Sequence, residues 1–238
     1  MKRILSTLSE KWPEYLIEAV VIVASILGAY ALDNWNENRK LQDASDVHLQ
    51  VLVQEMKADL NELKTLSTHM DVSLNAAQNL LTQFKTIRPL DSNSSNYLVS
   101  LVLEHTFSPK MTGFMALESI GGLSLLEDGL QQKIREYYAL TDKISAREDI
   151  SNSFIRDKYE ALLFDQYPHL WDKSNTFYYT KKLYEDDLRP PFQIDKNRIL
   201  NDRTLEVLVV ARQYQTQSQL GLYKNGIKSL ETIIQLLD

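Results

Sequence analysis

Residues 15–32 read YLIEAVVIVASILGAYAL, an apolar run of 18 residues in which Glu18 is the single charged side chain. A helix of about 20 mostly apolar residues is long enough to cross the hydrocarbon core of a bilayer. Aromatic residues, whose amphipathic rings favour the headgroup zone, flank the run on both sides: Trp12, Tyr15, Tyr30 and Trp35. We therefore predict a transmembrane helix over residues 15–32, with these four residues as membrane-interface anchors.

Basic residues indicate which way the predicted span crosses the membrane. Three basic residues and the α-amine precede the run, whereas only the Arg39-Lys40 pair closely follows it. The positive-inside rule then favours a cytoplasmic N-terminus. Residues 1–14 are predicted to be cytoplasmic and residues 33–238 to lie outside the cytoplasm. In a Gram-negative bacterium this describes a single-pass protein of the inner membrane with a periplasmic C-terminal domain.

Two other interpretations of the run stay open. A cleavable signal peptide also has basic residues before an apolar stretch, and Ala29-Tyr30-Ala31 has the A-x-A form of a cleavage site, so cleavage near Ala31 would release a secreted domain. The run is, however, longer than the roughly 7 to 15 residues of a typical signal-peptide core. A buried helix of a soluble protein is the other alternative, but such a helix rarely carries Trp and Tyr at both ends.

Glu18 is a candidate intramembrane polar site. It lies about one turn inside the run, where a carboxylate must be neutral, reach back to the interface or find a polar partner. We favour a shallow side chain that extends to the headgroups. The alternative is a role in helix association or in an ion path. Ala24 and Gly28 have the small-xxx-small spacing of closely packed spans, so a homo-oligomer through the span is also expected.

The residues after the run resemble a known family. Residues 32–40 read LDNWNENRK, which is similar to the phrase INNWNEERK that ends the N-terminal span of an uncharacterised bacterial membrane-protein family common in Bacteroidota. Residues 114–123, FMALESIGGL, and the segment from Leu130 to the paired Tyr137-Tyr138 resemble that family's middle segment. Asp33 departs from the usual Asn, and Ala31-Leu32 from a usual Gln-Ile pair. The resemblance implies a membrane-anchored helical domain of unknown function and carries over no catalytic residues.

The composition predicts an all-α fold. The chain of 238 residues has 44% hydrophobic and 24% charged residues, but only 7 Gly and 6 Pro, which is few for a protein of many short strands and turns. A net charge of −6 without a long basic run argues against a nucleic-acid partner. With no cysteine, the chain has neither disulfides nor thiolate metal sites.

A long helix is predicted over residues 41–87, inside a stretch from Gly28 to Pro89 that has no Gly or Pro between its ends. Apolar residues recur there at about 3.5-residue steps, the period of a coiled-coil seam: Leu49, Leu52, Met56, Leu60, Leu63, Leu66, Met70, Leu74, Ala77, Leu81 and Phe84. The stripe fits an intermolecular stalk, which could form a homo-oligomer, or a helix packed in its own bundle. We favour the bundle, and expect the helix to loosen at residues 33–38, where helix propensity is low.

Further elements follow in the soluble domain over residues 33–238. They are short helices over residues 97–119, a long helix over 128–166, an irregular segment over 168–195 and a long helix over 202–237. Gly121-Gly122 fits the C-terminal cap of a short helix, and Asp195 or Asn201-Asp202 can cap the last helix. Three long helices with shorter ones between them predict an antiparallel helical bundle.

The sequence predicts no catalytic, cofactor-binding or metal site. The four histidines are scattered, without the i, i+4 pairing of a helical metal site, and the glycine-rich nucleotide-binding and hydrolase motifs are missing. The acidic run at residues 185–187 lacks the ligand spacing of a calcium loop. We therefore expect a protein-interaction or sensing module with an unknown protein partner. The alternatives are an accessory subunit of a membrane transport complex, suggested by Glu18, and an enzyme.

Overall fold

The computed structural model describes residues 2–88, 90, 93–172, 178–193 and 195–237, and within these ranges the regular elements are all helices, with no strand. Its elements are α1 (Lys2–Thr86), α2 (Ser94–Ser100), α3 (Thr112–Ser119), η1 (Gly122–Leu125), α4 (Asp128–Phe154), η2 (Ile155–Glu160), α5 (Ala161–Gln166), η3 (Pro168–Trp171), α6 (Tyr178–Leu183), α7 (Lys196–Asn201) and α8 (Arg203–Leu237). The prediction of an all-α chain with a long apolar N-terminal helix is confirmed. Two compact units result: Met1–Leu52 with Thr112–Glu127, and Val53–Met111 with Asp128–Asp238.

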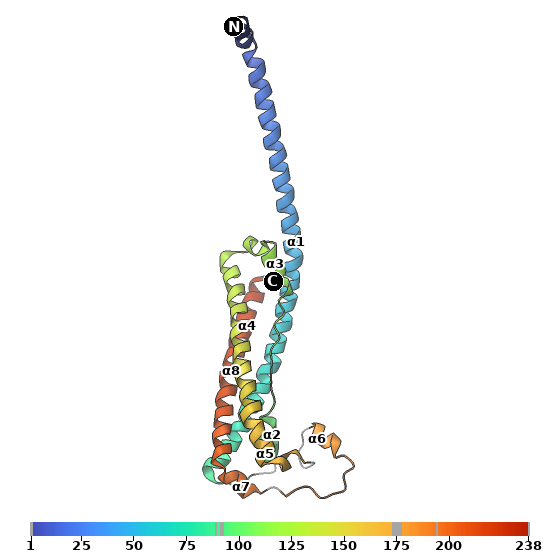
Figure 1. Cartoon of the computed structure of the whole chain (residues 1–238), viewed down its shortest axis with the longest axis vertical. Helices are drawn as coiled ribbons and strands as arrows, with labels where there is room; N and C mark the ends of the chain where they lie inside the picture. The colour runs from blue at the N-terminus through green and yellow to red at the C-terminus, as the bar shows by residue number, and fades with distance from the viewer. Residues whose placement is uncertain (1, 89, 91–92, 173–177, 194, 238) are drawn as a thin grey trace. The chain divides into compact units, whose positions relative to one another are not determined.

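The first unit contains the N-terminal part of α1 (Figure 1). Every side chain from Tyr15 to Lys40 is exposed, so this stretch buries nothing within its unit. The helix continues without a break through residues 33–38, where the sequence predicted a loosening. No Gly or Pro interrupts it there, and each Asp or Asn lowers helix stability by at most roughly 0.7 kcal/mol.

Two glycines let α3 and η1 lie against α1 in this unit, and a third allows the turn between α3 and η1. A Cβ on Gly113 would be 2.6 Å from the Leu52 backbone nitrogen, and one on Gly122 would be 2.5 Å from Ser45 Oγ. Gly121 has a φ of 74°, in the left-handed region that glycine adopts without strain, directly after α3. The predicted glycine cap of this short helix is therefore confirmed.

The second unit is built on α1 from Val53 onward, α4 and α8, of which α4 and α8 lie side by side (Figure 1). Ion pairs join α1 to α8: Lys64 with Glu231 at 2.8 Å, and Asp71 with Lys224 at 3.8 Å. In this unit, α1 buries part of the apolar stripe predicted from the sequence: Met56, Leu63, Met70, Ala77, Leu81 and Phe84. This part of the long helix is thus packed within its own chain.

One end of the second unit has an apolar core that the short elements close. Its members include Ala77, Leu80, Phe84, Leu98, Leu101, Tyr159, Leu163, Tyr167, Leu170, Ile199, Leu205 and Val209. Asp195 begins α7 by accepting the Arg198 backbone N–H at 3.0 Å. Asp202 begins α8 by accepting the N–H groups of Thr204 and Leu205 at 2.8 and 3.0 Å. Of the two alternatives predicted for the last helix, Asp202 is therefore the cap, whereas Asp195 caps the short helix α7 instead.

Two stretches of this unit differ from the sequence prediction. α2 ends at Ser100, and residues 103–111 are not helical, although a short helix was expected to continue there. The reason is that polar side chains of the long helices bind the backbone of this stretch and replace helical hydrogen bonds. Residues 128–166, predicted as one helix, change from α4 through the π-helical turn η2 into α5.

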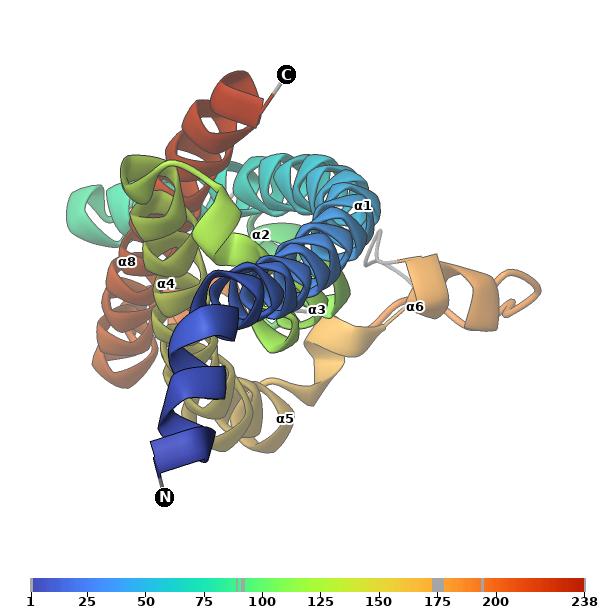
Figure 2. The ribbon, with the colours of Figure 1, turned by 90° about the horizontal axis from the view of Figure 1, so that it is seen from above.

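The segment predicted as irregular, residues 168–195, contains the short helices η3 and α6. Figure 2 shows α6 standing away from α4 and α8. The Phe164 and Trp171 rings stack near the start of the segment, with centroids 4.7 Å apart. Near its end, the Asp187 carboxylate accepts the Nε and Nη2 donors of Arg189 at 2.9 Å each. The acidic run is thus partly neutralised by an arginine of the same segment.

Candidate functional site

Buried polar side chains gather around residues 101–110 of the second unit, which we call the clamped segment. A non-helical stretch without a neighbouring strand leaves its backbone N–H and C=O groups without partners. Side chains from α1, α4 and α8 bind these groups: Asp59, Glu62, Tyr138, Glu148, Asn152 and Arg212. The arrangement is a set of polar side chains that binds a polypeptide backbone.

α1 contributes two carboxylates to the clamped segment. Asp59 is fully buried and accepts the Lys110 backbone N–H at 3.2 Å and the Tyr137 hydroxyl at 3.0 Å. Glu62 accepts the Ser108 N–H at 3.2 Å, while Lys110 Nζ lies 3.4 Å from Asp59 and 3.3 Å from Glu62. Burial raises the pKa of Asp59, and the hydrogen bonds from Tyr137 and Lys110 offset only part of that rise.

α4 places a third carboxylate, Glu148, against the same segment. Its Oε1 accepts the Phe107 N–H at 2.9 Å and also the Tyr223 hydroxyl, which in turn accepts Gln219 Nε2 at 2.7 Å. The other oxygen, Oε2, is buried and has no hydrogen-bond partner among the residues that the structure describes. Burial raises the pKa of Glu148 by more than the bonds from Tyr223 and Phe107 lower it.

Arg212 on α8 is a fully buried cation. Its Nε donates to the Leu101 carbonyl at 3.0 Å, its Nη2 to the Leu103 carbonyl at 3.3 Å and its Nη1 to Ser151 Oγ at 3.1 Å. The planar fork of the guanidinium group suits several acceptors at once. Burial lowers the pKa of Arg212 to about 10, so the group stays protonated at neutral pH. Among the residues that the structure describes, two backbone carbonyls and a serine hydroxyl, and not a carboxylate, accept its hydrogen bonds.

Two further contacts complete the clamp. Asn152 Nδ2 donates to the His105 carbonyl at 3.2 Å, and the Tyr138 hydroxyl donates to the Lys110 carbonyl at 3.2 Å. The His105 ring lies beside the His69 ring, with centroids 5.4 Å apart. Burial lowers the pKa of His105 to about 4, and the positive charges of His69 and of the buried arginine act in the same direction. His105 is consequently neutral at pH 7.

This polar core holds its own chain in place. Asp59, Glu148 and Arg212 all direct polar atoms at backbone groups of the clamped segment. Within the described ranges, no group of three or more His, Cys, Asp or Glu side chains is placed to hold a metal ion. We therefore assign these side chains a structural role, which is to fix the clamped segment between the long helices.

The sequence analysis assigned no role to the members of this core, and it quoted Tyr138 only within the family resemblance. Asp59 stands beside Leu60 of the predicted stripe, yet the structure buries Asp59 fully and leaves Leu60 half-buried. Arg212 stands at a buried position on the apolar face of α8. The signal that could have revealed these buried side chains is a charged residue at a position where the helical spacing expects an apolar one. A buried charge requires polar partners.

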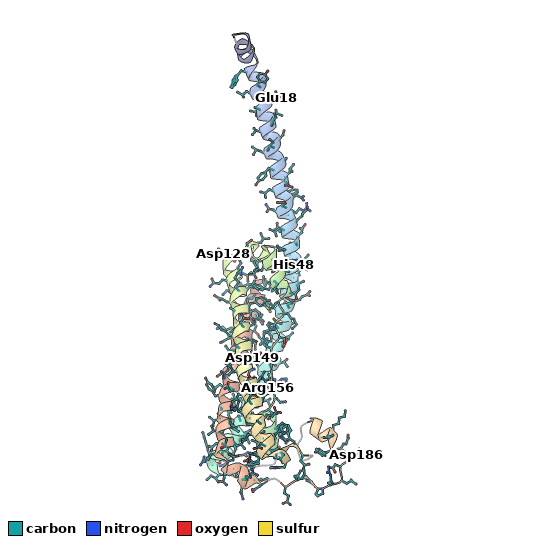
Figure 3. All side chains as sticks on the ribbon, viewed as in Figure 1. Glu18, His48, Asp128, Asp149, Arg156 and Asp186 are labelled. Atoms are coloured by element: carbon teal, nitrogen blue, oxygen red, sulfur yellow. The ribbon has the colours of Figure 1, made fainter. Side chains whose placement is uncertain are left out.

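The residues predicted for the membrane segment all lie on the exposed part of α1, and the structure does not bring them together. The anchors are largely exposed: Trp12 62%, Tyr15 50%, Tyr30 70% and Trp35 61%. Glu18 is labelled on this part of the helix in Figure 3, and its side chain is also exposed. Tyr15 and Tyr30 are separated by about 22 Å along the helix axis at 1.5 Å per residue. The Arg39 guanidinium lies 5.8 Å from the centre of the Trp35 ring.

In the described part of the chain, α1 is the one helix long and apolar enough to cross a membrane. None of its apolar window is buried, and the large aliphatic side chains from Leu16 to Leu32 are between 50% and 68% exposed. A core helix of a soluble protein would be mostly buried, which distinguishes this helix from that alternative. A signal sequence passes the same test of length and composition.

Comparison with known proteins gave no match. The chain matches no protein-family model, and neither a curated protein nor a solved structure matches it. The resemblance to the bacterial membrane-protein family common in Bacteroidota therefore stays a prediction that rests on the residues quoted above.

Proposed function

We propose that this protein is a single-pass protein of the inner membrane, in which residues 15–32 cross the bilayer. The exposed apolar window of α1 is the observation that carries the proposal. A helix that is apolar on all sides requires an apolar environment, and apolar patches of more than roughly 600 Å² are rare on the surface of soluble monomers. The lipid bilayer is the partner that fits this surface.

The proposed orientation places residues 1–14 in the cytoplasm and residues 33–238 in the periplasm. The excess of basic residues before the span supports it through the positive-inside rule. Tyr30 and Trp35, with the arginine that lies over the Trp35 ring, would then stand at the periplasmic interface. This orientation would place both the clamped segment and its polar core outside the cytoplasm.

We further propose that the second unit is an antiparallel helical bundle that acts as a protein-interaction or sensing module. The ion pairs support this topology, because Lys64 pairs with Glu231 whereas Asp71, farther along α1, pairs with Lys224, which comes earlier on α8. The buried charges support a non-enzymatic role, since they bind the chain's own backbone. We also propose that the chain belongs to the bacterial family named above. It would form a homo-oligomer through the span or through the long helix.

Glu18 supports a second candidate, an accessory subunit of a membrane transport complex. Its carboxylate is exposed on an otherwise apolar stretch of helix, where a polar partner on another chain would lower its desolvation penalty. Glu18→Gln should then alter ion movement or complex assembly. Unchanged transport and assembly would assign Glu18 to the headgroup zone. An enzymatic role would require a reproducible activity that is lost on replacing one carboxylate or histidine.

Alkali extraction of membranes from cells that express the chain with a C-terminal tag tests the anchoring. We expect the full-length tagged chain to stay in the membrane pellet and to be digested by protease added outside intact spheroplasts. A shortened chain in the soluble fraction would instead show cleavage near Ala31 and a secreted domain. A full-length chain released by alkali would show that residues 15–32 do not cross the bilayer.

A further inference from the structure

A small cavity lies between α1 and the segment formed by α3 and η1, and all of its lining residues belong to the first unit. Its volume is about 110 Å³. Polar side chains line it on the α1 side, where helical spacing places them on one face: Gln42, Ser45 and Asp46. Leucines of α3 and η1, among them Leu117 and Leu125, line the other side. The cavity therefore offers polar groups and an apolar wall to one small ligand.

Ser45 contributes a hydrogen-bonding group that the chain does not use. It is 6% exposed, and its Oγ has no hydrogen-bond partner among the residues that the structure describes. Ser25, on the same helix, instead donates to the Val21 carbonyl at 2.7 Å, the common bond of a helical serine. Gly122, which also lines the cavity, faces Ser45, since a Cβ on it would be 2.5 Å from Ser45 Oγ. Rotation of Ser45 about χ1 to another staggered position turns the hydroxyl toward a ligand, which would relieve a buried group without a partner.

The charge around the cavity is negative. The two stretches that contain its lining residues, 42–49 and 117–126, include three carboxylates and no Lys or Arg: Asp43, Asp46 and Glu118. Asp46 is the carboxylate that lines the cavity, and its exposed side chain forms no ion pair or hydrogen bond with any described residue. No group of three or more metal-ligating side chains is placed to hold an ion within the described ranges. The charge and the apolar wall together fit an organic cation.

We propose that this cavity binds a primary ammonium group on a short aliphatic stem. The Asp46 carboxylate pairs with the ammonium group, whose N–H groups donate to Ser45 Oγ and to the Gln42 amide oxygen. The stem packs against the leucines. A cavity of about 150 Å³ holds benzene, with six carbon atoms, so roughly 110 Å³ holds four or five non-hydrogen atoms, the size of a butylammonium ion.

This chemistry occurs in free small amines and in the lysine side chain of a protein partner. A lipid headgroup amine is not the source in the anchored chain, because Ser45 lies about 20 Å beyond Leu32 along the helix axis. The headgroup layer extends only roughly 5 to 8 Å beyond the hydrocarbon core. The inference rests on the proposed sensing or interaction role for its biological meaning. The cavity itself lies outside residues 15–32, so ligand binding can be measured whether or not those residues cross a membrane.

Saturation-transfer NMR of n-butylammonium chloride with the full-length chain in detergent micelles tests the proposal, with empty micelles as the background. We expect saturable binding with a Kd on the order of 1 mM. n-Butanol, which has the same number of non-hydrogen atoms and no charge, should bind at least about fivefold more weakly. The absence of saturable binding, or equal binding of the two compounds, would overturn the proposal.

Two carboxylates on the same exposed stretch of α1 provide a matched pair of variants. Asp46→Asn should weaken butylammonium binding by at least about fivefold, and Ser45→Ala should weaken it by roughly threefold. Asp43→Asn removes the same charge from an exposed residue that does not line the cavity, and should change the Kd by less than about twofold. Equal losses in Asp43→Asn and Asp46→Asn would show attraction by net charge alone and contradict the site.

Nα-Acetyl-lysine amide, titrated in the same way, distinguishes the two sources of the ammonium group. Tighter binding than that of butylammonium would support the site with a lysine side chain of a protein partner as its ligand. Weaker binding would support it with a free amine. A failure of the anchoring would instead appear in the alkali extraction, which does not depend on Asp46 or Ser45.

Discussion

Replacing Arg212 by methionine removes the buried cation and keeps a side chain of similar length. The Leu101 and Leu103 carbonyls and the Ser151 hydroxyl each lose a donor that lies between 3.0 and 3.3 Å away. A buried polar group without a partner costs about 1 to 3 kcal/mol. Relief of the desolvated charge offsets part of that loss, so we expect the free energy of unfolding to fall by about 3 kcal/mol.

Urea denaturation of the full-length chain in detergent micelles, followed by circular dichroism, measures this loss. Hydrogen exchange should show, in parallel, that residues 101–110 lose protection first, because the guanidinium group holds their carbonyls. Arg203→Met is the matched control on the same helix, since the Arg203 side chain is 84% exposed, and it should change stability by less than about 0.5 kcal/mol. Equal stability of Arg212→Met and the natural chain would refute the assigned role of the clamp.

Three further predictions concern the same core and the glycine contacts. Because burial raises the pKa of Glu148, the folded state holds a proton longer than the unfolded chain, so this group lowers stability as pH rises above the ordinary value of 4.5. Glu148→Gln keeps an oxygen acceptor and should remove that decline in urea titrations across pH; a slope identical to that of the natural chain would exclude Glu148 as its source. His105 acts in the opposite direction: its pKa is lowered from 6.5 to about 4, so protonation of the unfolded chain reduces stability as pH falls through this window. His105→Gln should recover up to about 2 kcal/mol at pH 4 relative to pH 7, allowing for partial exposure, and no recovery would refute the assignment. Gly113→Ala places a Cβ against the backbone of α1 and should lower the free energy of unfolding by about 1 to 3 kcal/mol. Gly129→Ala is the control, because its Cβ meets no atom within 4 Å and should leave stability unchanged or raise it. Equal shifts of the melting temperature in the two variants would contradict the contact at Gly113.

Local signals in the sequence were enough to predict the helical class and several helix ends. The scarcity of Gly and Pro excluded a fold of many short strands and turns, and the described residues indeed form helices and no strand. Gly121 adopts the left-handed conformation predicted for a cap, and Asp202 caps the last helix. These features depend on a few neighbouring residues, so a single sequence is sufficient to identify them.

The clamped segment could not be predicted in the same way. Leu98, Leu101 and Val102 have helical spacing, but the structure ends the helix at Ser100. The competing hydrogen bonds come from side chains that are distant in the sequence, such as Arg212, which is 111 residues away from its acceptor Leu101. Local periodicity contains no information on such pairings, because tertiary contacts override local propensity. Buried charges within an apolar stripe were the only local sign of them.

Labelling of single cysteines with a membrane-impermeant maleimide tests the central claim, one crossing of the membrane by residues 15–32. Ser6→Cys places a thiol before the span, and Gln235→Cys places one at the exposed end of α8. In intact spheroplasts we predict labelling of Gln235→Cys at once and of Ser6→Cys only after lysis. Labelling of both variants before lysis, or of neither, would place both ends of the chain on one side and contradict a single crossing.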